Sequence, residues 1–338
     1  MKKKSLITII VIAGVVAVIL LMVGMARLLT NALMMDNFPT DQTTVLVRDR
    51  TLPGGSLRMS LPTEPYIGIV NVQGIIEGQR SASGMFDTPE TYQHNAMMEY
   101  INSMMDDPYN VAILLNINSP GGTVYEAEEL LEKLQEYQTV TGRPVWAYMN
   151  QMAASGGYLV AASADVIYAN QNTITGSIAV IISGFDLTGL YEMLGIHYFS
   201  VVSGQNKDMT SPDHDQLQIY QVLVDEIHDR FVEHIISGRN MSWRDVEEIA
   251  DGRIFSASQA LDYGLIDEIS SFEDMVEDMR DEFGNILFYE PEPVISSWAA
   301  MFGRVEEMIP RSNIQIGLDI AERFGQGVPL LLDKRGVQ

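Results

Sequence analysis

The stretch that decides the fold reads Met149-Asn150-Gln151-Met152-Ala153-Ala154-Ser155-Gly156-Gly157-Tyr158. It joins an apolar segment, which predicts a strand, to an alanine-containing segment that favours a helix. Ser155 stands among residues with almost no side chain, so a turn here presents its hydroxyl at the N-terminus of the following helix. Free N–H groups at that point favour a developing negative charge. The pattern is typical of a serine nucleophile and also of a serine that only caps a helix.

Short apolar runs alternate with helical periodicity on both sides of this stretch. We expect strands at 66–72, 111–117, 145–149, 166–169 and 198–202, and helices that include 124–140 and 216–236. Continuous apolar runs of this length predict strands that are buried on both faces of a sheet. The alternation predicts an α/β fold of right-handed βαβ units, with function in the loops at the carboxyl ends of the strands.

A second glycine pair follows the strand 111–117 directly, in Asn118-Ser119-Pro120-Gly121-Gly122. Since both glycine pairs sit at the ends of neighbouring strands, we expect them at the same edge of the sheet. Backbone N–H groups in such a loop are suited to holding an oxyanion.

Composition excludes several classes of protein. The chain has 338 residues, 46% of them hydrophobic, and a formal net charge of -24, which disfavours binding to nucleic acid. The absence of cysteine excludes disulfides, thiolate metal sites and a thiol nucleophile. No histidine-rich metal motif occurs either, so we expect neither a metal nor another cofactor.

The N-terminal segment predicts a membrane anchor. Three lysines, residues 2–4, precede the uncharged run 5–25, which is long enough to cross a bilayer as one helix. The excess of lysines before the run places the N-terminus in the cytoplasm and the rest of the chain outside. The alternative is a cleaved signal, for which Gly24-Met25-Ala26 offers a small-residue cleavage pattern.

A serine nucleophile requires a base, and the lysines offer one candidate. The others lie before the anchor, in the terminal tail or, as Lys133, four residues after Glu129 on a helix surface, whereas Lys207 follows the strand expected at 198–202. A lysine serves as a base only where a dry surrounding lowers the pKa of its amine from about 10.4 to about 7–8. Ser177, in Thr175-Gly176-Ser177-Ile178, is our candidate for a hydroxyl that orients the amine, and it is also an ordinary turn residue.

Taken in order, these motifs resemble the signal peptide peptidase A family of serine peptidases. The resemblance rests on residues 118–122, 154–158, 175–178 and 204–207, together with the segment 250–260, and it spans about 66–269. It implies a ClpP/crotonase-like fold and a Ser/Lys dyad, with Ser155 as nucleophile and Lys207 as general base. Oxyanion donors would be Gly156 and one of Gly121 and Gly122, with Ser177 beside the lysine. The family also implies a homo-oligomeric ring that completes the site.

These observations divide the chain into five parts. They are a cytoplasmic N-terminus, an anchor, a linker, a peptidase domain and a C-terminal tail, at 1–4, 5–26, 27–63, 64–290 and 291–338. The expected protein is a single-pass, extracytoplasmic serine endopeptidase that degrades remnant signal peptides and other short or unfolded membrane-derived peptides. The tail, with small and apolar residues around 297–301, is a further candidate, as a pseudo-substrate that docks in a cleft.

Three alternatives stay open at this point. One is a membrane serine protease of the same dyad type that works with a stomatin partner. Another is an acyl-CoA hydratase-like enzyme, although its cofactor is cytosolic. The third is a non-catalytic scaffold that binds peptides.

Overall fold

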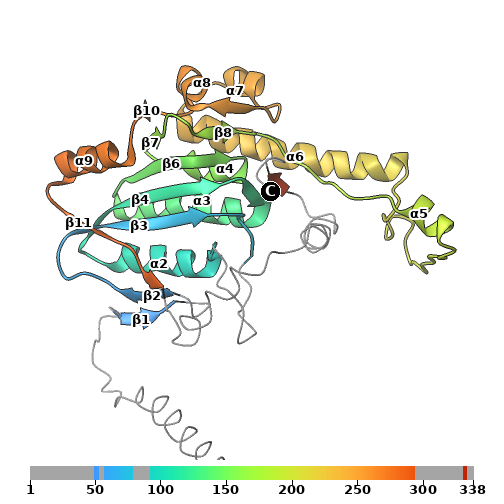
Figure 1. The fold of residues 1–338 in the computed structure, drawn as a ribbon, viewed down its shortest axis with the longest axis horizontal. Helices are drawn as coiled ribbons and strands as arrows, with labels where there is room; N and C mark the ends of the chain where they lie inside the picture. The colour runs from blue at the N-terminus through green and yellow to red at the C-terminus, as the bar shows by residue number, and fades with distance from the viewer. Residues whose placement is uncertain (1–48, 53–56, 79–91, 294–329, 333–338) are drawn as a thin grey trace, which may run out of the picture. The chain divides into compact units, whose positions relative to one another are not determined.

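The computed structural model describes residues 49–52, 57–78, 92–293 and 330–332. The predicted anchor at 5–26 and the tail segment at 297–301 lie outside these ranges. The described residues all belong to one compact unit, Val47–Gln338. Figure 1 shows its elements, which are β1 (Asp49–Thr51), β2 (Leu57–Ser60), β3 (Tyr66–Gln73), α2 (His94–Asp106), β4 (Asn110–Ser119), β5 (Gly121–Thr123), α3 (Val124–Thr141), β6 (Val145–Ala154), α4 (Gly156–Ala161), β7 (Val166–Ala169), β8 (Ile174–Gly176), α5 (Thr188–Met193), α6 (His214–Arg239), α7 (Trp243–Ile249), β9 (Ile254–Ser256), α8 (Ala257–Asp262), β10 (Glu268–Ile269), α9 (Phe272–Phe283), β11 (Leu287–Tyr289), β12 (Glu292–Pro293) and β13 (Leu330–Leu332).

The centre of the unit is an 8-stranded sheet with the strand order β10-β7-β6-β4-β3-β11, and β8 and β9 extend it beside β6. All of its strand pairs are parallel except β8 with β9. The predicted α/β architecture with a mostly parallel sheet is therefore confirmed. The long strand β6 pairs with β7 through Met149 and then with β8 through Ala154, which carries the chain directly to Ser155.

Helices cover both faces of this sheet. The main hydrophobic core includes the buried faces of α2, α3, α4 and α6, whereas Met275 and Met279 of α9 pack with Ile67 and Leu114 in a second cluster. Apolar residues of the strands thus meet helices on each side, as a parallel sheet requires. The prediction that these strands are buried on both faces of the sheet is therefore confirmed.

A separate three-stranded sheet has the order β1-β2-β12, in which β1 and β2 precede the main sheet in sequence and β12 follows it. Leu52, Met59 and Leu61 from this region are buried in the main core. These residues precede position 64, where we expected the peptidase domain to begin. Their alternation with turn formers is typical of a linker, and only packing against the core reveals their role.

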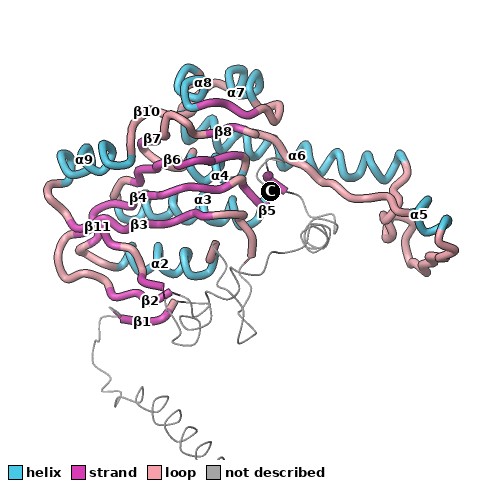
Figure 2. The backbone as a smooth tube through the Cα atoms, viewed as in Figure 1, coloured by secondary structure: helices cyan, strands magenta, loops and turns pink. Residues whose placement is uncertain are grey.

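The strand predicted at 198–202 is absent, and this prediction was wrong. Residues 183–213, which we call the arm, leave the sheet after β8 and contain α5, a helix with no buried residue. Figure 2 shows the arm as loop and one short helix at the far end of α6. Phe199 and Val201 are 85% and 95% exposed. The edge beside β8 is already taken by β9, so no free position of the sheet remains there for the segment.

None of the helices within the described ranges combines the length and apolar character that are needed to span a bilayer.

Candidate functional site

Ser155 lies at a strained turn between β6 and α4. Its φ and ψ angles are 54° and -119°, a left-handed conformation that is costly for any residue with a side chain. Two backbone hydrogen bonds fix it there. The N–H of Ser155 donates to the carbonyl oxygen of Gly176 at 2.7 Å, and its own carbonyl accepts from Leu159 N–H at 2.9 Å. A tight strand-to-helix turn of this kind is the usual setting of a nucleophile.

The hydroxyl of Ser155 does not cap the helix. It occupies the N-cap position of α4 but makes no capping hydrogen bond. The residue is fully buried, and its Oγ has no hydrogen-bond partner among the described residues. A buried hydroxyl without a partner costs about 1–3 kcal/mol. The arrangement therefore favours a chemical role for this oxygen over the structural one.

The segment from Ser119 to Gly122 lies beside this turn. Ser119 is in register with Ala153 of β6, and a Cβ added to Gly157 would stand 2.8 Å from the carbonyl oxygen of Ser119. Glycine at 157 thus allows the first turn of α4 to approach this loop. The second glycine pair therefore lies next to the loop that leads to the first.

Gly122 lies against the backbone of Ile76. Ile76 forms an isolated parallel bridge to it, and a Cβ at Gly122 would lie 1.8 Å from the carbonyl oxygen of Ile76, so only glycine fits. Ile76 N–H donates to the carbonyl of Gly121 at 2.9 Å, and Thr123 N–H donates to the carbonyl of Ile76 at 2.8 Å. Since peptide groups alternate along a strand, the N–H of Gly122 points to the opposite edge. The N–H of Gly121 is engaged by Ser119 Oγ at 3.1 Å.

Gly156 and Ser177 complete the part of the site that this chain brings together. Gly156 is the first residue of α4, and the N–H groups of a first helical turn have no partner within the helix. Ser177 directly follows Gly176, the residue that accepts the hydrogen bond from Ser155. It is buried, has a φ of 53° and donates its N–H to the carbonyl of Arg253 at 2.7 Å.

Lys207 lies elsewhere, on the arm. Its side chain is exposed, and its backbone N–H donates to Gly204 at 3.0 Å. It lines a cavity of about 580 Å³ with residues that include Ile182, Phe185 and Tyr220. Neither Ser155 nor any of the glycines described above lines this cavity. Within one chain, the serine and the lysine therefore belong to different surroundings.

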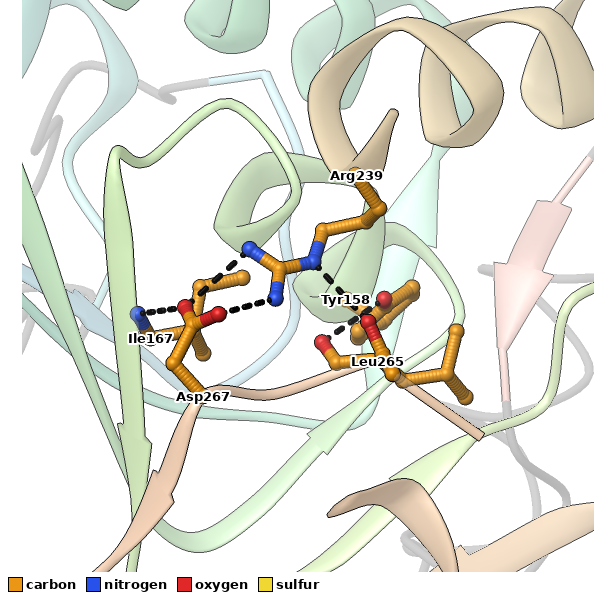
Figure 3. A network of polar contacts seen from close by, with 6 residues as sticks. Tyr158, Ile167, Arg239, Leu265 and Asp267 are labelled. Atoms are coloured by element: carbon orange, nitrogen blue, oxygen red, sulfur yellow. Dashed lines mark hydrogen bonds and ion pairs between the residues drawn. The ribbon is translucent and has the colours of Figure 1, made fainter. Parts of the chain in front are cut away.

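Helices α4 and α6 both bond to the segment that contains Leu265 and Asp267 (Figure 3). Tyr158 of α4 donates its hydroxyl to the carbonyl of Leu265 at 2.9 Å, and burial raises the pKa of Tyr158, so the phenol remains a donor. Arg239, at the end of α6, binds Asp267 at 2.7 Å and 3.2 Å through its two terminal nitrogens. Asp267 also accepts the N–H of Ile167 at 2.7 Å.

Sequence reasoning missed three polar residues near the candidate catalytic groups. Ser119 engages Gly121, as described above. Asp208 accepts the hydroxyl of Tyr198 at 2.8 Å, and Gln216 donates to the carbonyls of Gln205 and Asp208 at 3.3 Å and 3.2 Å. Gln216 also forms a capping box with Asp213, a pattern that the sequence does contain and that marks the start of α6.

No group of side chains suited to a metal ion occurs within the described ranges.

Comparison with known proteins finds one family whose sequence pattern matches part of this chain. Residues 138–284 match peptidase family S49. The "Putative signal peptide peptidase SppA" of Enterococcus faecium is 36% identical over 63% of this chain and 62% of its own length. Protease 4 of Haemophilus influenzae is 34% identical over 62% of this chain and 34% of its own length. This chain thus spans about three fifths of the first relative and one third of the second.

Among solved structures, a mutant form of the 1510-N membrane-bound stomatin-specific protease is 15% identical, with a TM-score of 0.44 over 69% of this chain and 100% of that chain. A likeness of that degree carries no argument about mechanism or partner.

Proposed function

We propose, from the premise that this chain belongs to peptidase family S49, that it is a serine endopeptidase in which Ser155 is the nucleophile. The observation that carries the proposal is the buried, unbonded hydroxyl of Ser155 on a strained turn beside the strand edge of Gly122. Peptide substrates would lie extended along that edge. The ClpP/crotonase-like fold expected of the family is in keeping with the mostly parallel sheet.

The chemistry assigns one role to each group. Ser155 Oγ attacks the scissile carbonyl while the amine of Lys207 takes its proton, and the ammonium then protonates the leaving amine. The N–H groups of Gly122 and Gly156 hold the oxyanion. Gly122 is favoured over Gly121 because the N–H of Gly121 is engaged by Ser119 Oγ. Ser177, one residue from the acceptor of the Ser155 N–H, orients the lysine.

The dyad forms between subunits in this proposal. Lys207 lies on the arm, whose apolar side chains are exposed, while Ser155 in the body lacks a partner. An arm that lies against a neighbouring subunit would bury these side chains and bring its lysine into a site that water then leaves. Repetition of this contact around an axis gives a closed homo-oligomeric ring.

The cellular setting follows from the sequence. Residues 5–26 anchor the chain in the cell membrane with its N-terminus in the cytoplasm, which places the peptidase domain outside the cytoplasm. Remnant signal peptides and other short or unfolded membrane-derived peptides are then the accessible substrates. The relative from Enterococcus faecium carries the name of a signal peptide peptidase, which supports this class.

The test uses two inactive variants of the full chain. Ser155→Ala and Lys207→Ala should each abolish cleavage of a signal-peptide substrate, with the thermal midpoint unchanged. When the two are mixed and reassembled, sites that pair an intact serine with a neighbour's lysine return, giving about a quarter of the wild-type rate for random assembly. Each variant reassembled alone is the control.

A mixture that stays inactive would contradict a dyad formed between subunits, and full activity of Lys207→Ala would contradict the lysine as base. A serine-reactive phosphonate probe separates an enzyme from a scaffold, since only a peptidase has an activated serine. Labelling of Ser155 should be lost in Lys207→Ala. Wild-type chains that neither label nor cleave would refute the proposed function.

A further inference from the structure

Gln216, in the first turn of α6, differs from every residue around it in sequence. Between Ile178 and Ile227, a stretch that lies wholly within the described ranges, it is the only buried residue. Its exposed fraction is 8%, whereas the large apolar side chains of the arm are exposed. The side chain that is enclosed where the arm meets α6 is therefore a polar amide.

The amide nitrogen of Gln216 binds the loop that carries Lys207 on both sides of the lysine. Nε2 donates to the carbonyl oxygen of Gln205 at 3.3 Å and to that of Asp208 at 3.2 Å. Within the same loop, the N–H of Lys207 donates to the carbonyl of Gly204 at 3.0 Å. One side chain thus holds the backbone before and after the proposed base.

The amide oxygen of Gln216 holds the start of α6. Oε1 accepts the N–H of Asp213 at 3.1 Å, while Asp213 Oδ1 accepts the N–H of Gln216 at 2.9 Å, and together these bonds form a capping box. The partners determine the orientation of the amide, because carbonyl oxygens only accept and a backbone N–H only donates. Gln216 therefore joins the loop directly to the helix.

Capping of the helix does not by itself require glutamine. A glutamate at this position of a capping box supplies the same acceptor. A carboxylate, however, has no N–H to donate to two carbonyl oxygens. The capping box accounts for Oε1 of Gln216, whereas Nε2 serves only the loop that carries Lys207.

We propose that Gln216 is a positioning residue for the general base, and this inference rests on the proposed function. Its amide holds the Lys207 loop against the N-terminus of α6, so that the helix determines where the amine of the lysine lies. Lys207 and Leu217, the residue after Gln216, line the same cavity. A misplacement of about 1 Å can lower a rate by about a hundredfold, so a base on an exposed arm needs a support of this kind.

The experiment compares Gln216→Glu with Gln218→Glu in the full chain. Each change adds one negative charge near the start of α6, but Gln218 is exposed, and only Gln216→Glu removes the donors to the loop. With a signal-peptide substrate, Gln216→Glu should lower kcat about 10-fold to 100-fold and leave KM unchanged, because the base acts in the chemical step. Gln218→Glu should stay within about twofold of the wild type, and both variants should keep the wild-type thermal midpoint.

The pH dependence separates position from charge. A glutamate beside Lys207 favours the ammonium form of the lysine, and a higher pH reverses that effect. A displaced amine stays displaced at any pH. The high-pH plateau of kcat/KM for Gln216→Glu should therefore remain at least about tenfold below that of the wild type. Recovery to the wild-type plateau would overturn the positioning role, and so would equal kcat values for the two variants.

A further measurement needs no catalysis. In the Ser155→Ala background, amide hydrogens of a fragment that covers residues 203–210 should exchange faster with Gln216→Glu than with Gln218→Glu. Equal exchange would show that the amide does not hold the loop, and it would overturn this inference while leaving the proposed function intact. A wild-type chain that neither cleaves peptide nor labels at Ser155 would overturn both, because no base would then need positioning.

Discussion

Asp208 accepts hydrogen bonds from hydroxyl groups in the loop that carries Lys207. Its carboxylate accepts the Tyr198 hydroxyl at 2.8 Å and, from Thr210, the N–H at 3.1 Å and the hydroxyl at 2.7 Å. Hydrogen bonds from Ser200, Thr210 and Tyr198 hold the pKa of this carboxyl well below its usual range. The stability that these bonds give the loop is present above the pKa of the unfolded chain, about 3.9, and is lost only as the pH falls through the lower folded value.

The position of Lys207 should therefore depend on Asp208 at all neutral pH values. We expect Asp208→Ala to lower kcat/KM about tenfold, because a mobile lysine spends less time within reach of the serine. The thermal midpoint should stay constant, since the loop is exposed. Peptide cleavage between pH 6 and 9 measures the effect, which should not vary across that range.

Asp229→Ala is the matched control, because Asp229 is an exposed carboxylate on α6, outside this loop. Asp208→Asn, which keeps an oxygen acceptor for Thr210, should recover part of the loss. A rate for Asp208→Ala within twofold of the wild type would show that these hydrogen bonds do not position the lysine.

At the scale of the element, α6 contacts both the arm and the helices that cover the main sheet. Its C-terminal half is packed tightly, since a Cβ at Gly238 would lie 1.9 Å from the carbonyl oxygen of Ala162. Its N-terminal half presents Leu217 and Val222 to the surface and receives the Lys207 loop through Gln216. A rigid helix that is fixed at one end sets the direction of what it carries at the other.

The ion pair at the fixed end should contribute measurably to stability. The side chain of Arg239 is only 7% exposed, whereas Asp267 is 40% exposed, so solvent screens the pair in part. We expect Arg239→Ala to lower the free energy of unfolding by about 1–2 kcal/mol. Urea denaturation, followed by tryptophan fluorescence, measures the change.

Arg253→Ala provides the comparison. Arg253 also contacts both carboxylate oxygens of a neighbour, Asp251, but both side chains are 51% exposed. Its removal should leave the urea midpoint unchanged. Equal urea midpoints for Arg239→Ala and Arg253→Ala would mean that the burial of Arg239 does not add to the stability of the folded chain.

The elements also show what the sequence could predict. The strand at 166–169 and the helix α3 follow local periodicity, and both were predicted from it. The apolar run at 198–202 follows the same rule but is exposed. An apolar pattern indicates that a segment is suited to burial, but it does not identify the surface against which the segment packs. Ser155 was recognisable as a turn residue, whereas its unbonded hydroxyl depends on packing that no local pattern encodes.

β13 marks the other limit of prediction. Nothing in the sequence of residues 330–332 identifies Gly121–Thr123 as their partner, because strand pairing over such a separation is decided by which edges remain free. The same holds for β1 and β2, whose short alternating segments resemble a linker until Leu52 and Met59 are seen in the core. Contacts between distant segments are therefore where local reasoning ends.

At the scale of the whole molecule, the exposed arm is the surface on which the proposed assembly depends. Large apolar side chains stand on α5 and the loops around it, among them Met193, Phe199 and Val201. Exposed apolar groups in one contiguous segment are typical of an interface, whereas isolated ones are common on any surface. In the proposed ring the partner is a second copy, whose Ser155 lacks the base that this arm carries.

Replacing Phe199 and Val201 together by serine should dissociate the assembly. Burial of their apolar side chains against a neighbour stabilises the proposed interface, and serine offers far less apolar area to bury. We expect the double variant to elute as a monomer in light-scattering chromatography of the detergent-solubilised chain. Peptide cleavage should fall at least about a hundredfold, since the lysine no longer reaches a serine. The thermal midpoint should stay the same, because neither side chain packs within its own chain.

Val140→Ser is the matched control, since Val140 is 68% exposed at the end of α3 and lies outside the arm. It should remain assembled and active. A double variant that is monomeric yet cleaves peptide at the wild-type rate would show that serine and lysine meet within one chain, by a movement of the arm toward its own body. A double variant that assembles but is inactive would show that Phe199 and Val201 position Lys207, because the arm would still be bound to its neighbour.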